Sequence, residues 1–216
     1  MSTTRPLRAD AERNRARILA AASEVFAERG LDVSLDDIAA HAGVGVGTVY
    51  RRFPDKDALI DALFEDKIDR AVALADASLE IEDPWEGFTT FMRGMCRMQA
   101  QDRGFKDALL LRGPGRERVA AARERIAPRA IKLLTRAQEA GAVRADLGPF
   151  DVPMINLCVG LIADRTRDIA PDYWERVLTI LIDGISAQGR TTPMPVEQLD
   201  REAFTEAMAS PRRRRA

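Results

Sequence analysis

The sequence predicts an all-α fold, and three observations support this fold class. Apolar residues recur at steps of three and four along almost the whole chain, which is the spacing of one helix face. Signals for strands are nearly absent, and aromatic residues make up only 6% of the chain. Glycines and prolines divide the periodic stretches into about nine helices. We expect these at about 9–28, 35–42, 46–53, 56–79, 84–102, 105–112, 116–140, 150–168 and 172–187.

The composition is that of an ordinary globular protein. The chain has 216 residues, of which 46% are hydrophobic and 31% charged, and its formal net charge is −1. No apolar run approaches the roughly 20 residues of a membrane span, and no signal-peptide core follows the N-terminus. We therefore expect a cytoplasmic protein without membrane contact. Cys96 and Cys158 lie far apart, which favours two reduced thiols, with a redox-sensing pair as the alternative.

The first expected helix, 9–28, follows residues 1–8, which we expect to form a flexible arm. Its apolar residues have the spacing of a single buried face, and Gly30 follows them as a natural stop. These apolar residues are Ile18, Ala21, Ala22, Val25 and Phe26.

Two short helices joined by a tight turn are predicted next. Ser34 is a good N-cap for helix 35–42, and Asp36 and Asp37 stand in its first turn, where the helix dipole favours negative charge. Gly43 supplies the positive φ that a tight turn between crossed helices requires. The inward face of this helix should consist of Leu35, Ile38, Ala39 and Ala42.

The second helix of the pair, 46–53, should bury Val49 and Phe53. Gly45 and Gly47 each cost up to ~1 kcal/mol in a helix, but the missing side chains let the backbone come close to a partner. The exposed side, available to a nucleic-acid groove, should consist of Val46, Gly47, Thr48, Arg51 and Arg52.

The fourth helix should begin at Lys56, because Pro54 ends the helix before it and Asp55 can cap the new one. A lysine in a first helical turn opposes the helix dipole unless an anion is its partner. A DNA phosphate would be such an anion.

About residues 12–62 resemble the N-terminal signature of the TetR family in both residue types and spacing. The resemblance is carried by Ile38, Ala39, Ala40, Ala42, Gly43, Val44, Gly47, Thr48, Val49, Tyr50, Phe53, Lys56, Leu59 and Ile60. It implies that residues 9–62 bind double-stranded operator DNA through a helix-turn-helix at about 34–53. It also implies a dimeric, ligand-responsive repressor, with an activator on the same scaffold as the alternative.

The resemblance assigns roles to single residues. Thr48, Tyr50 and Lys56 would contact phosphates, and Ser34 belongs to the same DNA-binding set. Base edges would be faced by Val46, Gly47 and either Arg51 or Arg52. One departure is Gly45, because many members carry a serine there that caps the recognition helix and contacts a phosphate.

Residues 63–189 should form a ligand-binding and dimerisation domain. By resemblance, helices 84–102, 105–112 and 116–140 would surround a pocket for a small-molecule effector, and 150–168 and 172–187 would form a homodimer. The last two helices carry apolar residues over too wide an arc for one buried stripe, which supports burial by a second subunit. The candidate pocket residues, which also read as ordinary core, are Phe91, Met92, Met95, Cys96, Met98 and Asn156.

Residues 190–216 are expected to form a polar tail, whose run Arg212–Arg215 either contacts nucleic acid or is simply solvated. The competing class is a helical enzyme or chaperone-like binding protein. The sequence shows no catalytic or phosphate-loop constellation, and its only histidine, His41, should lie at the surface. We therefore expect no catalytic residue, no metal site and no cofactor.

Overall fold

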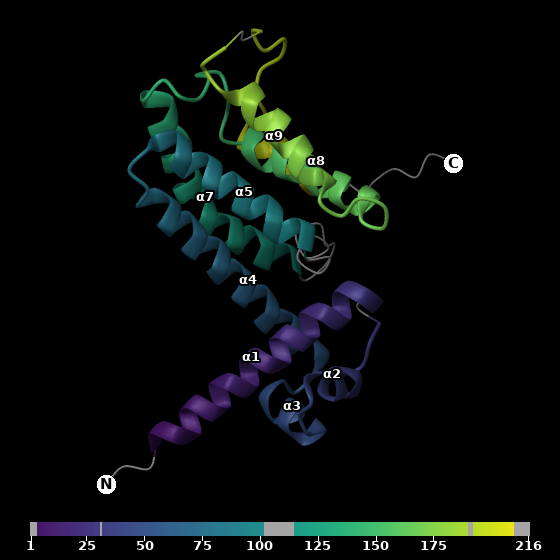
Figure 1. Ribbon diagram of the computed structural model, residues 1–216. Coiled ribbons are helices and arrows are strands. Elements are labelled where there is room, and N and C mark those ends of the chain that lie inside the picture. The colour runs from purple at the N-terminus through teal and green to yellow at the C-terminus, as the bar shows by residue number, and fades with distance from the viewer. Residues whose placement is uncertain (1–3, 31, 102–114, 190–191, 210–216) are drawn as a thin grey trace. The chain divides into compact units, whose positions relative to one another are not determined.

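The computed structural model describes residues 4–30, 32–101, 115–189 and 192–209 (Figure 1). Within these ranges every regular element is an α-helix, so the predicted all-α fold is confirmed. The expected helix at 105–112 lies outside the described residues. The helices are α1 Thr4–Arg29, α2 Leu35–Ala42, α3 Val46–Arg52, α4 Lys56–Leu79, α5 Pro84–Gln101, α7 Gly115–Glu139, α8 Asp151–Thr166, α9 Tyr173–Ile185 and α10 Arg201–Ala209.

The chain divides into two compact units, and the boundary between Asp69 and Arg70 falls inside α4. The boundary expected from the sequence was after residue 62. One continuous helix therefore supplies residues to both units. For this reason no change of composition along the chain marks the boundary between them.

The first unit is a small helical domain with its own core. The apolar stripe of α1 is buried together with the inner faces of α2 and α3 and the start of α4. Ala22 and Ala39 have no exposed surface, and their small side chains let the helices pack closely. The large buried side chains of this core include Ile18, Val25, Phe26, Ile38, Val49, Phe53 and Leu59.

α1 begins at Thr4 and not at about residue 9, so residues 4–8 of the expected flexible arm are helical. Arg5, Leu7 and Arg8 in this stretch are good helix formers. Pro6 lies in the first turn, where its missing N–H breaks no helical hydrogen bond. Apolar spacing by itself does not mark this helix start, because the buried stripe of α1 begins only at Ile18.

The second unit packs α5 against α7, α8 and α9, and α8 against α9 (Figure 1). Its core is formed by large side chains such as Phe88, Met92 and Leu178. α5 and α8 approach closely at Gly160, where an added Cβ would lie 2.4 Å from the Gln99 amide nitrogen. A larger residue at this position would force the buried Gln99 side chain to move.

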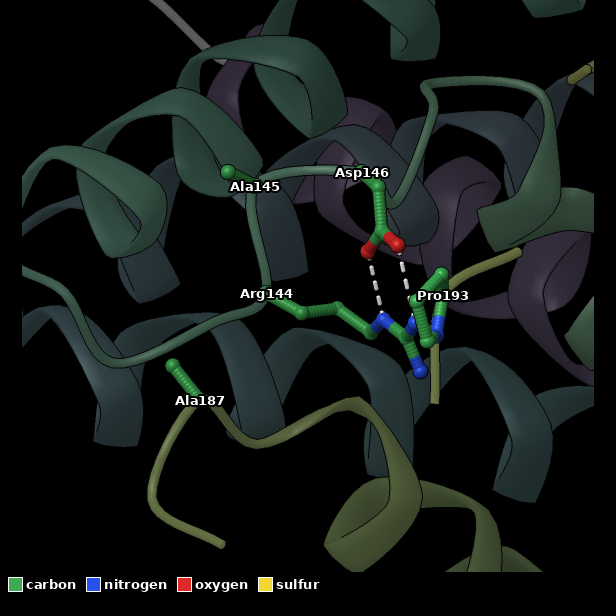
Figure 2. Close-up of a pocket in the computed structure, with 5 residues that line it drawn as sticks. All are labelled: Arg144, Ala145, Asp146, Ala187 and Pro193. Atoms are coloured by element: carbon green, nitrogen blue, oxygen red, sulfur yellow. Dashed lines mark hydrogen bonds and ion pairs between the residues drawn. The ribbon is translucent and has the colours of Figure 1, made fainter. Parts of the chain in front are cut away.

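The expected polar tail contains a further helix, α10, which belongs to the second unit. Phe204 is buried, and its ring stacks on Phe150 with 5.1 Å between the centroids. Upstream, Arg144 pairs with Asp146 through two nitrogens (Figure 2). Arg144 also donates to the Thr192 carbonyl oxygen at 2.6 Å. Residues 192–206 are therefore part of the fold, whereas the arginine run 212–215 lies outside the described residues.

Candidate nucleic-acid interface

The N-terminus of α2 is closed by a capping box. The Ser34 hydroxyl accepts from the Asp37 amide at 3.1 Å, and the Asp37 carboxylate accepts from the Ser34 amide at 3.0 Å. The Ser34 side chain, followed by its backbone N–H, holds the pKa of Asp37 below its usual value. The Ser34 hydroxyl is thus already engaged within the chain, although the residue is exposed.

The turn between α2 and α3 has the geometry that the sequence predicts. Gly43 adopts φ +63°, a left-handed conformation that glycine tolerates best, and Val44 donates from its amide to the Ala39 carbonyl at 3.1 Å. Arg17 of α1 donates to the Ala42 carbonyl at 2.9 Å. This hydrogen bond satisfies a carbonyl at the C-terminal end of α2. Sequence reasoning missed it because 25 residues separate the partners.

α3 buries one face and exposes the other. Val49 has no exposed surface and Phe53 is 4% exposed, as the sequence predicts. The N-cap Gly45 offers no side-chain hydrogen bond. A Cβ built at Gly47 would meet nothing within 4 Å, so the fold itself does not require a glycine there. The exposed or half-buried residues of this face are Val46, Gly47, Thr48, Tyr50, Arg51 and Arg52.

The start of α4 borders this face in sequence. The Asp55 carboxylate accepts from the Ala58 amide at 2.7 Å and caps the helix, as expected. Lys56, in the first turn, is half-buried.

Two further polar links tie α1 to the helix pair. Glu24 contacts the exposed His41 of α2 at 2.7 Å, and Glu12 lies 3.9 Å from the Arg52 guanidinium of α3. In each pair, the two side chains belong to two different helices. The sequence contained no signal for either, since ion pairs between helices depend on how the helices cross.

We define the α3 surface as the half-buried Thr48 and the exposed residues Val46, Gly47, Tyr50, Arg51 and Arg52. Guanidinium groups can bond a guanine edge with two hydrogen bonds, and hydroxyls and ammonium groups can donate to phosphate oxygens. A single helix with this surface has the width that a DNA major groove admits. The arrangement suits groove recognition and offers no acid, base and nucleophile set.

The candidate ligand residues lie in the second unit and are brought together by α5 and α8. Phe91, Met92 and Cys96 are buried in its core, and the other two methionines are half-buried. The Cys96 thiol donates to the Asn156 side-chain oxygen at 2.8 Å. Burial raises the pKa of Cys96 to about 12, so the thiol stays protonated at neutral pH.

A cavity of about 350 Å³ lies elsewhere in the second unit (Figure 2). It shares no residue with the candidate ligand set. Its lining is Arg144, Ala145, Asp146, Ala187 and Pro193.

Among the described residues, no three His, Cys, Asp or Glu side chains gather as a metal ion would need. Within the same part of the chain, each helix is too short or too polar to span a bilayer.

α8 and α9 expose apolar side chains that the core of the unit does not bury. Ile180 is 62% exposed and Tyr173 47%. On α8, Cys158 is exposed and Met154, Leu157 and Leu161 are half-buried. We call these four residues, together with Tyr173 and Ile180, the outer α8–α9 face.

Two family descriptions match the chain. Residues 18–63 match the family described as bacterial regulatory proteins, tetR family. Residues 83–187 match the C-terminal domain described as transcriptional regulator SbtR-like. The first match contains the capping box, the turn and α3, and the second contains α5 and the outer α8–α9 face.

Individual proteins agree with these descriptions. A TetR transcription regulatory protein from Mycobacterium vanbaalenii is 40% identical, covers 84% of this chain and 99% of its own, and superposes with a TM-score of 0.65. The regulator SCO0520 from Streptomyces coelicolor is 30% identical over 81% and 99% of the two chains, with a TM-score of 0.63. The HTH-type transcriptional regulator SAR0097 from Staphylococcus aureus is 40% identical over 82 residues, so the match spans only 39% of its length.

Proposed function

The chain belongs to the TetR family of transcriptional regulators, and from this premise we propose that it is a repressor. It binds a palindromic operator as a homodimer, and a small-molecule ligand releases it. The observation that carries the proposal is the α3 surface, a short helix whose one face is anchored in the core and whose other face presents two arginines.

Single residues take the following parts in the proposed reading of DNA. The hydroxyls of Thr48 and Tyr50 and the ammonium group of Lys56 contact phosphates and position the domain. Val46 and Gly47 approach the bases, and an arginine reads a guanine edge. Ser34 contributes its position at the start of α2 more than its hydroxyl, because that hydroxyl is engaged in the capping box.

The proposed homodimer forms through α8 and α9. Its support is the outer α8–α9 face, since exposed and half-buried apolar side chains on two helices that pack together can form an interaction surface. A two-fold dimer presents two copies of the α3 surface, so its operator is an inverted repeat with half-sites about one helical turn apart or a multiple of it.

The proposed effector is a small, largely apolar molecule bound by the second unit near Phe91, Met92, Met95, Cys96, Met98 and Asn156. Methionines adapt to varied apolar shapes, and the Asn156 amide supplies a polar anchor. By linkage, a ligand that lowers operator affinity must itself be bound more weakly by the DNA-bound protein, by the same factor.

A selection experiment tests this function. The purified protein is used to enrich duplexes from a random-sequence library, and the enriched sequence is compared with the DNA upstream of its own gene. We expect an inverted repeat, and lower transcription from a promoter that contains it. Failure to enrich any sequence contradicts operator binding. Enrichment with raised transcription identifies an activator instead.

A further inference from the structure

The recognition helix carries two neighbouring arginines whose surroundings differ. Arg52 lies 3.9 Å from the Glu12 carboxylate of α1. Arg51 is exposed, and no ion pair of its side chain is found among the described residues. With about 100° of rotation per helical residue, Arg51 stands on the side opposite the buried Val49, while Arg52 is turned back towards the core.

Glu12 is itself held in place. Its carboxylate lies 4.0 Å from Arg15, three residues further along α1, and the Arg15 side chain is only 26% exposed. Glu12 therefore lies between an arginine of its own helix and Arg52 of α3. Its side chain is 70% exposed, so it borders the α3 surface and contributes nothing to the core.

A carboxylate in this place has consequences for DNA binding. Non-specific binding depends almost entirely on cations that neutralise phosphates. A phosphate that approaches Arg52 must compete with Glu12 for the same guanidinium, whereas a base edge that approaches Arg51 has no such competitor. The pair thus weakens binding to any DNA more than it weakens binding to the correct sequence.

We infer that Glu12 is a specificity-determining positioning residue: it holds Arg52 against α1, leaves Arg51 to read base edges, and suppresses non-specific DNA binding. This inference rests on the proposed function, since it presupposes that α3 reads DNA.

The test compares Glu12→Gln with Glu28→Gln, a matched control that removes the same charge from an exposed glutamate of the same helix. Binding to a 30-base-pair duplex of random sequence is measured by fluorescence anisotropy at several KCl concentrations. We expect E12Q to bind about two- to fivefold more tightly than the wild type, the range of an exposed ion pair. Its log-log salt slope should steepen by about one, because Arg52 becomes free for one phosphate. E28Q should keep the wild-type slope.

Arg52→Ala decides whether the effect passes through Arg52. In the R52A background, E12Q should no longer steepen the log-log salt slope, whatever effect R52A has by itself. A merely structural role of Glu12 would alter thermal stability and not this slope. If E12Q and E28Q have the same slope, or if E12Q steepens the slope without Arg52, the inference is overturned.

The selected operator separates this inference from the proposed function. E12Q should gain less affinity for the operator than for random DNA, so the ratio of the two affinities falls. An equal gain on both duplexes overturns the inference and leaves the function intact. A wild-type protein that selects no operator contradicts the function itself.

Discussion

A substitution at Gly47 should affect fold stability and the proposed DNA binding in opposite directions. The structure offers open space for a Cβ at this helical position, so Gly47→Ala should stabilise the fold by up to about 1 kcal/mol. The same methyl group should cost roughly 1–3 kcal/mol of DNA-binding free energy if a DNA groove closes tightly on the helix. Urea unfolding and anisotropy with the selected operator measure the two effects on one protein. Stabilisation without any loss of affinity would show that DNA does not come close at this position.

Arg51 and Lys56 should respond differently to truncation. Arg51→Ala should cost roughly 1–3 kcal/mol on the operator and relax the preference at defined base pairs, as expected for a guanine contact. Lys56→Ala should weaken binding to all sequences alike and lower the salt slope by about one, as expected for a phosphate contact. Operator variants with single base changes, titrated at several salt concentrations, distinguish the two patterns. An R51A protein that retains the full base preference contradicts the assignment.

Cys96 and Cys158 should differ in reactivity, because burial raises the pKa of Cys96 to about 12 while Cys158 is exposed. A thiol reagent at pH 8 should label Cys158 in a folded monomer, in which the outer α8–α9 face is open, and Cys96 only after unfolding. Above about pH 8.5 the unfolded chain ionises its Cys96 while the folded protein keeps the proton, so stability is lost as pH rises towards 12. The slope is about 1.4 kcal/mol per pH unit. Urea unfolding at pH 8 and 10 should show this loss in the Cys158→Ala protein and not in Cys96→Ala.

At the scale of elements, α10 shows how a polar segment becomes part of the fold. Phe204 is 6% exposed and stacks on Phe150 beside the start of α8. Phe204→Ala should therefore destabilise the second unit by about 3 kcal/mol, the lower end of the range for buried phenylalanines. The matched control is Val196→Ala, because Val196 is 77% exposed on the same segment. Equal melting temperatures for the two variants would show that α10 contributes no stability.

At the scale of the whole molecule, the proposed homodimer depends on the outer α8–α9 face. Ile180→Glu places a charge on a side chain that is 62% exposed in one chain and should be buried in the proposed dimer. We expect dimerisation at least about thirtyfold weaker, since truncated central contacts cost 2 kcal/mol or more. Sedimentation velocity across protein concentrations measures this change, and Ile131→Glu on α7, 43% exposed, is the control. A dimer unaffected by I180E excludes this face as the interface.

Features that depend on neighbours in the chain could be predicted from the sequence. The N-cap Ser34, the left-handed Gly43, the buried Val49 and the cap Asp55 all follow from residue types at helix ends and from the helical period. For the same reason the all-α fold and the α3 surface could be predicted before any coordinates.

Contacts between distant segments became visible only in the folded chain. The contacts of Arg17 with the α2 end, of Glu12 with Arg52, and of Phe204 with Phe150 join residues 25 to 54 positions apart. No local period or propensity encodes such pairs, because they depend on the crossing of helices and on space left by the core. For this reason the polar stretch 190–216 was expected to be a tail, although Phe204 is buried against Phe150 in the folded chain.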